Sequence, residues 1–337
     1  MPSPQFESVL RAVAAGGRET HEERMLSHAH ANAPLQQRTL RDLPPPSPQK
    51  AKSAIVISAG PSLSRRNSIQ RIRDSGYTGV VIAVDASLAA CLRNGLIPDY
   101  VLTLDPHPTR IVRWFGDPDW DKHAANDDYF LRQDLDQEFR DNAARRNAET
   151  IGLVDRYGSQ LTVLVASCSP PNAVQRLATA GCDMFWWNPL VDNPHEPESI
   201  SRNLYDINRA PSMNTGGNVG TSAWVFAVSI LKLPEVGLVG MDMGYYNDTP
   251  HEQTQLYYEY ISHLGSSDDI ESCFHEVVYP TTGETHYTDP TYYWYARNFI
   301  ELNKRSTAKT LNCTEGGALV DPTIECVSLD AFLANHR

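Results

Sequence analysis

The sequence lacks the features typical of membrane proteins, nucleic-acid-binding proteins and disulfide-rich domains. No apolar run in its 337 residues approaches the roughly 18 residues that a membrane-spanning helix needs, so we expect no membrane span. Lys and Arg number 29 against 41 Asp and Glu, a net charge of −12, which argues against nucleic acid as a partner because phosphate binding needs clustered basic residues. The six cysteines include no CxxC pair, so neither a zinc site nor a small disulfide framework is expected.

The N-terminal residues read as a polar helical segment. Residues 1–17 have neither a basic start nor a continuous apolar stretch, so we expect no secretory signal and a reducing, cytoplasmic location. The run LPPPSP at residues 43–48 ends the helical pattern, because consecutive prolines favour a stiff extended linker. We therefore divide the chain into an N-terminal helical segment with its linker, residues 1–50, and one domain, residues 51–337.

Short apolar runs separated by helical segments follow from residue 53. The predicted strands are Ala54–Ser58, Val80–Val84, Tyr100–Leu104, Leu161–Val165, Cys182–Trp187 and Val236–Val239. Helices are predicted between them at residues 64–75, 86–93 and 172–179. Their continuous rather than alternating hydrophobicity indicates a parallel sheet covered on both faces. The fold class predicted is therefore α/β, a Rossmann-like doubly wound, mostly parallel sheet with helices on both faces.

Three segments fall outside this repeating pattern. Residues 116–150 are strongly charged and predict a helical insertion on the surface. Residues 188–214 hold several prolines and little periodicity, which favours a long ordered loop near a site. Residues 245–337 are expected to be a C-terminal extension of helices and loops, with one helix starting at Asp289-Pro290 because Asp before Pro is a strong start signal.

The first polar loop follows the strand at residues 54–58. Its sequence is Ser58-Ala59-Gly60-Pro61-Ser62. Gly60 lets the backbone approach a phosphate, and the two serine hydroxyls can donate hydrogen bonds to it. The loop is neither a P-loop nor a GxGxxG fingerprint. We expect it to bind phosphate, and a tight turn in which Ser62 caps the next helix is the alternative.

Three predicted strands are followed by a carboxylate: Asp85, Asp105 and Asp242. Because ligands of open parallel sheets bind beyond the carboxyl ends of the strands, these side chains could bind ribose hydroxyls, hold Mg²⁺ or act as a base. Asp85 and Asp105 can equally cap a following helix. Their occurrence on successive strands favours a polar ligand.

A glycine-rich loop at residues 214–222 leads into a helix whose apolar residues recur at core-facing spacing from Ala223 to Leu231. The free N–H groups at such a helix start, with the positive end of the helix dipole behind them, suit a phosphate. A plain flexible connection is the alternative. The residues expected to form this cradle are Thr215, Gly216, Gly217, Asn218 and Thr221.

The absence of histidine and nucleophile motifs excludes two kinds of site but does not identify the function. The sequence has no HxxxH, HExxH or G-x-S-x-G pattern, so neither a dedicated zinc site nor that type of serine nucleophile is expected. From the residues alone, we expect an α/β enzyme that binds a nucleotide or phosphate and has several convergent carboxylates.

Four segments in this order resemble a known family: ISAGPSL (57–63), VIAVDASLAACLRNGLIPDYVLTLDP (81–106), TGGNVGTSA with PEVGLVGMDMGY (215–245), and LNCTEGGALV (311–320). They are similar to the family that joins archaeal 6-hydroxymethylpterin diphosphokinases with bacterial flagellar motility accessory factors. These accessory factors resemble glycosyltransferases that move nonulosonic acids onto flagellin. They are similar in turn to the bacterial sialyltransferases.

This resemblance implies a transferase core in which the two glycine loops grip the phosphate of a nucleotide donor. The TEGGA run and the chain length favour the motility accessory branch. The resemblance further implies that the tyrosines after Gly240-Met241-Asp242 steady the leaving phosphate and that a histidine is the general base. The catalytic candidates are His286, Asp105, Tyr245 and Tyr246, and Asp85, Asp242 and Glu315 join the donor-binding residues.

The resemblance favours a glycosyltransferase that moves a CMP-activated nonulosonic sugar to a protein or glycan acceptor with no obligatory cofactor. The alternative is a 6-hydroxymethylpterin diphosphokinase that uses ATP and Mg²⁺, the metal being held by Asp85 and Asp105. A second alternative is a nucleotide-binding assembly factor without turnover. A homo-oligomer is compatible with all three.

Overall fold

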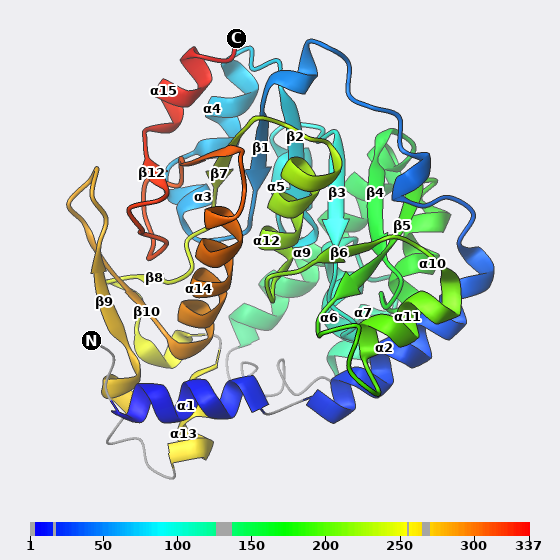
Figure 1. Ribbon diagram of the computed structural model, residues 1–337, viewed down its shortest axis with the longest axis horizontal. Helices are drawn as coiled ribbons and strands as arrows, with labels where there is room; N and C mark the ends of the chain where they lie inside the picture. The colour runs from blue at the N-terminus through cyan, green and yellow to red at the C-terminus, as the bar shows by residue number, and fades with distance from the viewer. Residues whose placement is uncertain (1–3, 16–17, 126–136, 255, 265–269) are drawn as a thin grey trace. The chain divides into compact units, whose positions relative to one another are not determined.

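The computed structural model describes residues 4–15, 18–125, 137–254, 256–264 and 270–337 (Figure 1). The chain packs into two compact units. The first comprises Met1–Thr20, Pro46–Val80 and Gly216–Arg337, and the second comprises His21–Pro45 and Val81–Thr215. The prolines at residues 44–46 thus lie at one of the divisions, while the predicted split at residue 50 into segment and domain stays a prediction.

The first unit is built on four parallel strands in the order β12-β11-β7-β1. Their bounds are Ala54–Ile57 (β1), Glu235–Val239 (β7), Lys309–Asn312 (β11) and Glu325–Cys326 (β12). All four residues of β1 are buried, as its unbroken apolar sequence requires. β1 and β7 end together, with Ile57 opposite Val239, so the loops that leave both strands start side by side.

A small antiparallel sheet in the same unit has the strand order β8-β10-β9 (yellow and orange in Figure 1). Its strands are Tyr245–Tyr246 (β8), His275–Val278 (β9) and Thr285–Thr288 (β10). The sequence predicted only helices and loops after residue 245. The strands were missed because β8 and β12 are two residues long and β9 and β10 are rich in His, Glu and Thr, without the apolar runs that marked the others.

Helices surround these strands in the first unit. They are α1 (Pro4–Ala15), α3 (Ser62–Arg65), α4 (Ser68–Asp74), α12 (Val219–Val225), which continues as a π-helical turn Phe226–Ile230, α13 (Tyr257–Leu264), α14 (Pro290–Lys304) and α15 (Leu329–Ala334), with 3₁₀ turns at Lys50–Lys52, His251–Gln253 and Ile270–Cys273. The predicted start of α14 is confirmed, because the Asp289 carboxylate accepts a hydrogen bond of 2.8 Å from the Tyr292 N–H. The single helix predicted over residues 64–75 is divided at Asn67, whose φ is 49°.

The second unit is built on five parallel strands in the order β2-β3-β4-β5-β6. Their bounds are Val80–Val84 (β2), Tyr100–Thr103 (β3), Thr162–Ala166 (β4), Asp183–Leu190 (β5) and Ser212–Asn214 (β6). The predicted strands over residues 80–187 are confirmed. Together with the first unit this confirms the α/β fold class, in which parallel strands alternate with helices along the chain.

The helices of the second unit are α2 (Arg18–Asn32, which enters this unit at His21), α5 (Asp85–Arg93), α6 (Pro108–Trp114), α7 (Trp120–Ala124), α9 (Gln137–Tyr157), α10 (Pro171–Thr179) and α11 (Ile200–Asn208), with 3₁₀ turns at Ala33–Leu35, Leu40–Asp42 and Gly158–Gln160. The core on one side of the sheet joins apolar residues of β3, β4, α5, α6 and α10, among them Val101, Val163 and Leu177. The helices expected at residues 86–93 and 172–179 are confirmed.

Two expected segments differ from the structure or are only partly described. The long loop expected at residues 188–214 is wrong, because β5 extends to Leu190 and α11 and β6 follow. Ser199 caps α11 by accepting a hydrogen bond from the Arg202 N–H, while Ile200 and Leu204 bury its apolar side. The prolines obscured this short helix because they all lie outside it. The charged insertion at 116–150 contains α7 and the start of α9, and its residues 126–136 lie outside the described residues.

Candidate functional site

Asp242, just beyond β7, is held by the loop that leaves β1. Its Oδ1 accepts a hydrogen bond of 3.1 Å from the Ser62 N–H, and its Oδ2 accepts one of 2.6 Å from the Ser62 hydroxyl. A Cβ atom at Gly60 would collide with this carboxylate and with the Gly240 carbonyl, so only glycine fits there. The structure therefore brings together two of the loops predicted from the sequence. The Ser62 hydroxyl binds Asp242 rather than capping α3.

Burial sets the protonation of Asp242. Desolvation raises its pKa to about 6, although hydrogen bonds from Ser62 and the nearby Arg66 guanidinium act in the opposite direction. A buried carboxyl group with a pKa near neutrality can hold or release a proton under ordinary conditions. This property distinguishes Asp242 from an exposed carboxylate that only caps a helix.

The predicted residues Tyr246 and His286 are direct cross-strand neighbours. β8 pairs with β10 so that Tyr246 lies opposite His286, and their ring centroids are 4.6 Å apart in an edge-to-face arrangement. Both side chains are buried, and neither the tyrosine hydroxyl nor either imidazole nitrogen makes a hydrogen bond to any residue that the structure describes. Gly316 leaves room beside them, since a Cβ atom there would lie 2.7 Å from the Tyr246 Oη.

Burial also determines the charge of His286. Desolvation lowers the pKa of its imidazole, opposed by the Glu284 carboxylate 3.9 Å from Nε2. The ring is therefore neutral at physiological pH and can accept a proton. Its neighbour Tyr245 lies opposite Tyr287, and its hydroxyl donates a hydrogen bond of 3.1 Å to the Asp289 carboxylate.

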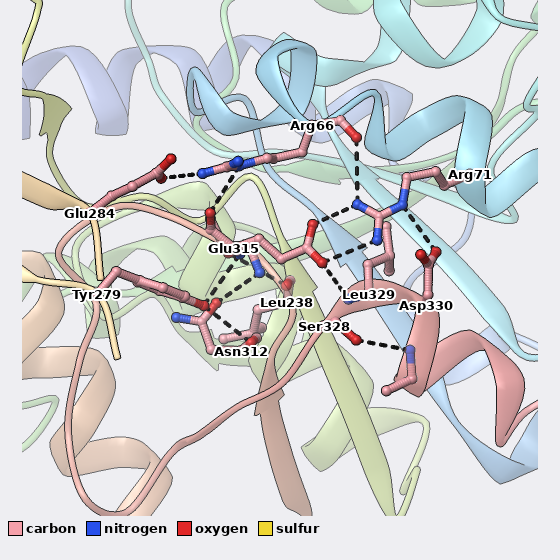
Figure 2. A network of polar contacts seen from close by, with 12 residues as sticks. Arg66, Arg71, Leu238, Tyr279, Glu284, Asn312, Glu315, Ser328, Leu329 and Asp330 are labelled. Carbon is pink, nitrogen blue, oxygen red and sulfur yellow. Dashed lines mark hydrogen bonds and ion pairs between the residues drawn. The ribbon is translucent and has the colours of Figure 1, made fainter. Parts of the chain in front are cut away.

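Two arginines that sequence reasoning missed lie at the same place. Arg66 forms an ion pair with Glu284, and its Nε donates a hydrogen bond of 3.0 Å to the Glu315 carbonyl (Figure 2). Arg65 lies 4.1 Å from the centroid of the Tyr246 ring and makes a two-pronged ion pair with Asp248. The signal was present in the sequence, because an arginine pair directly follows the SAGPSLS loop.

Glu315 connects this region to α4 and α15. Its φ is 56°, an uncommon conformation for a residue other than glycine. Its carboxylate accepts hydrogen bonds of 2.5 and 3.1 Å from the Arg71 guanidinium and one of 3.0 Å from the Leu329 N–H (Figure 2). These bonds occupy the carboxylate, so Glu315 positions the loop that carries Gly316. Its predicted part in donor binding stays a prediction.

The second glycine-rich loop lies at the start of α12. Gly216 and Gly217 have φ values of 55° and 90°, and Asn218 caps the helix by accepting a hydrogen bond of 2.9 Å from the Thr221 N–H. The Ser58 hydroxyl, buried and without a partner among the described residues, faces this turn, since a Cβ atom at Gly220 would lie 2.7 Å from it. The predicted loops after β1 and before α12 thus meet in the first unit. Thr215 is buried in the second.

Asp85 and Asp105 lie at the carboxyl ends of β2 and β3 in the second unit. Asp85 is the first residue of α5, and its Oδ1 accepts a hydrogen bond of 2.7 Å from the Ala86 N–H. Burial raises its pKa to about 7, against the effect of the neighbouring Thr103 hydroxyl and of the hydrogen bond from the Ala86 N–H, and the Asp105 carboxylate raises the pKa further. Asp105 accepts a hydrogen bond of 2.7 Å from the His107 N–H. The helix that follows is capped by His107, not by Asp105.

Neither a metal centre nor a membrane helix is apparent in the described part of the chain. No group of three or more His, Cys, Asp or Glu residues there is arranged to hold a metal ion, and no helix there is long and apolar enough to cross a membrane. Magnesium usually needs only one or two protein carboxylates, with water and substrate phosphates completing its coordination. That Asp85 and Asp105 hold Mg²⁺ stays a prediction.

Comparisons with known proteins agree with the family suggested by the sequence. Residues 27–115 match the family model described as 6-hydroxymethylpterin diphosphokinase MptE-like. The family resemblance is confirmed. The match contains Ser58, Gly60, Asp85 and Asp105, but not the Asp242, Tyr246 and His286 group.

A solved structure supports the same fold. The chain is similar to the MAf glycosyltransferase from Magnetospirillum magneticum AMB-1, with a TM-score of 0.54 and 17% sequence identity over 91% of this chain and 38% of that one. It is also 36% identical, over 53 residues, to an uncharacterized protein of Treponema pallidum (strain Nichols), which covers 16% of this chain and 24% of that protein. The chain therefore spans well under half the length of both proteins.

Proposed function

We propose that this chain is a transferase that uses a nucleotide-activated donor, and that it moves a CMP-activated nonulosonic sugar to a hydroxyl group of a protein or glycan acceptor. The observation that carries the proposal is the pairing of neutral, buried His286 with Tyr246 beside Asp242 and Arg66. A base, a hydroxyl donor and a cation in one place are what displacement of a phosphate leaving group needs.

His286 would act as the general base. Its imidazole takes the proton of the acceptor hydroxyl as the acceptor oxygen forms its bond to the anomeric carbon of the sugar. In the same step the bond from that carbon to the phosphate oxygen breaks, and the nucleoside monophosphate leaves with the electron pair. The lowered pKa of His286 supports this role because the ring is uncharged when the acceptor arrives.

The departing phosphate would be stabilised by Arg66 and by nearby hydroxyls. Arg66 carries the charge that opposes the developing negative charge, and it would exchange its ion pair with Glu284 for the phosphate. The hydroxyls of Ser58 and Tyr246, which have no partner among the described residues, are free to donate hydrogen bonds. Gly60 and Gly316 keep the surrounding backbone close.

A second candidate is diphosphoryl transfer from ATP to 6-hydroxymethylpterin, which is favoured by the family match over residues 27–115. In that reaction Asp85 and Asp105 would hold Mg²⁺, which would neutralise negative charge on the transferred phosphates. The two reactions differ in the nucleotide that is released, CMP or AMP, and in their need for a metal.

Nucleotide-dependent stabilisation tests the proposal first. Thermal unfolding is measured with CMP, CDP, UDP, GDP and ATP, each with Mg²⁺ or EDTA. A ligand at about 100 times its Kd adds about 2.7 kcal/mol. We expect CMP to stabilise the chain in EDTA and Arg66→Ala to reduce the effect. Stabilisation by ATP alone, and only with Mg²⁺, favours the diphosphokinase. No shift with any nucleotide contradicts both.

Turnover is then tested with matched histidine variants. Release of CMP from a CMP-activated nonulosonic acid is measured for His286→Gln and for His195→Gln, whose exposed side chain lies in the second unit. We expect His286→Gln to lose about 10²- to 10⁴-fold in rate, the usual contribution of a general base, and His195→Gln to keep the wild-type rate. Binding of CMP without turnover in the wild type would indicate a nucleotide-binding assembly factor instead.

A further inference from the structure

Three buried polar atoms at the carboxyl end of β4 have no hydrogen-bonding partner within the described residues: the hydroxyls of Ser167 and Ser169 and the Oδ1 of Asn32. Their residues are 0%, 1% and 0% exposed. Most buried polar atoms in proteins are hydrogen-bonded, so three such atoms on neighbouring residues call for a physical explanation.

The three side chains are held in place by the backbone around them. Asn32, the last residue of α2, donates from its Nδ2 to the carbonyls of Ser167 (3.0 Å) and Ser169 (2.7 Å). Because two carbonyls need this amide nitrogen, the orientation of the amide is fixed, and its oxygen is left as an unpaired acceptor. The Ser167 N–H donates to the Trp187 carbonyl at 2.8 Å, which anchors this segment to β5.

One acidic group, Asp105, lies next to this segment. In the parallel pairing of β3 with β4, Thr103 lies opposite Val165. Two residues further along each chain, the same register brings Asp105 opposite Ser167. Two further observations agree with this placement. The Cys168 thiol donates to the Leu104 carbonyl at 3.4 Å, and the Asp105 carboxylate is close enough to help burial raise the pKa of that thiol. A phosphate or carboxylate would be repelled here.

We propose that Asn32, Ser167 and Ser169 form a binding subsite for an uncharged group rich in O–H or N–H donors, either a hydroxylated sugar ring or an amino-bearing heterocycle. The reason is the chemistry of the unpaired groups: an amide oxygen that only accepts, and two hydroxyls that can each accept and donate, beside the Asp105 carboxylate. The inference rests on the proposed function, because the sugar ring or heterocycle bound here would be part of the donor or of the acceptor. It also gives the N-terminal helix α2 a part in ligand binding, through its last residue.

Serine-to-alanine variants separate this role from a structural one. Removing a hydroxyl that has no partner should leave the stability of the free protein unchanged or raise it, whereas a hydroxyl that binds ligand should weaken affinity when lost. The matched control is Ser201→Ala in the same unit. Ser201 is 2% exposed, but its hydroxyl accepts hydrogen bonds from the N–H groups of Val191 (2.9 Å) and Asp192 (3.2 Å).

The probes carry no phosphate: ribose, cytidine and 6-hydroxymethylpterin, with binding measured by calorimetry. We expect the wild type to bind at least one of them, and Ser167→Ala and Ser169→Ala each to weaken that binding about fivefold, the usual effect of one hydrogen bond. Ser201→Ala should bind as the wild type does but unfold more easily. Binding of ribose or of the pterin distinguishes a sugar source from a heterocycle source.

Two outcomes would overturn the subsite. If the wild type binds none of the three probes, or if Ser167→Ala and Ser169→Ala bind as tightly as the wild type, the unpaired atoms are satisfied by buried water only. A chain that binds CMP or ATP through the phosphate but fails these tests would keep the proposed transferase function while refuting the subsite. If the wild type binds no nucleotide at all, the proposed function itself is refuted.

Discussion

Replacing Asp85 by Asn should stabilise the protein, and increasingly so as the pH rises. Burial raises the pKa of this carboxyl from 3.8 to about 7. Between these values the folded chain keeps a proton that the unfolded chain releases, so the free energy of unfolding falls as pH rises through this window. A difference of about 3 pKa units corresponds to about 4 kcal/mol. The amide of Asn never ionises and avoids this cost, and its oxygen can still accept from the Ala86 N–H.

The assay is urea unfolding of wild type and variant at several pH values between 4 and 8.5, followed by tryptophan fluorescence. Trp186 and Trp187 are buried in β5 and report on the unit that contains Asp85. We expect nearly equal stability of the two proteins at pH 4 and a difference that approaches about 4 kcal/mol above pH 7.5. Although it is more stable, Asp85→Asn should bind nucleotide less tightly or lose activity. Residues of functional sites often lower the stability of the fold, so replacing one can raise stability and reduce function together.

Asp192→Asn in the same unit is a control of opposite sign. Burial pushes the pKa of Asp192 upward, but hydrogen bonds from Ser201, Ser199 and the Ile200 N–H outweigh it and lower the pKa. Its charged form therefore stabilises the fold above its unfolded pKa, and the variant should become less stable than wild type as pH rises. If the Asp85→Asn and wild-type curves run parallel across the whole pH range, the argument from burial is refuted.

Three further predictions concern the first unit. Gly60→Ala forces a methyl group onto a carboxylate and a carbonyl and should cost about 1–3 kcal/mol in urea unfolding; wild-type stability would contradict the close approach seen at this residue. Glu315→Gln leaves Arg71 without its main charge partner and should cost about 1–3 kcal/mol, whereas Asp330→Asn, at an exposed carboxylate, should change stability by less than about 0.5 kcal/mol. If His286 is the base, kcat should fall on acidification only below about pH 6.5, because burial lowers its pKa; a profile that falls at higher pH would exclude it.

Much of the fold could be read from the sequence because its strands are unusually plain. Runs such as AIVI and VVIAV are apolar at every position, which happens when both faces of a parallel strand are covered. Local signals also placed the start of α14 at Asp289-Pro290. Signals of this kind are absent from β8, β9 and β12, whose residues form strands only because a partner strand supplies the hydrogen bonds.

The candidate site divides in the same way. Strand-end carboxylates and glycine loops are visible as residue types, so Asp85, Asp242 and Gly60 could be singled out without coordinates. The groups that these residues contact could not be predicted. The Ser62 hydroxyl could have capped a helix, but in the fold it binds a carboxylate 180 residues away in the chain. The fold decided that choice.

The sequence by itself determined the α/β class, the carboxyl-end position of its polar residues and the resemblance to a transferase family, because these depend on local hydrophobicity and short motifs. Only the tertiary structure decided that Tyr246 faces His286, that Arg66 joins them and that Asn32 reaches the end of β4. Such contacts join residues that are far apart in the chain. The burial that shifts the pKa of Asp85, Asp242 and His286 also depends on residues far away in the sequence. Desolvation acts on a group only when the rest of the fold surrounds it.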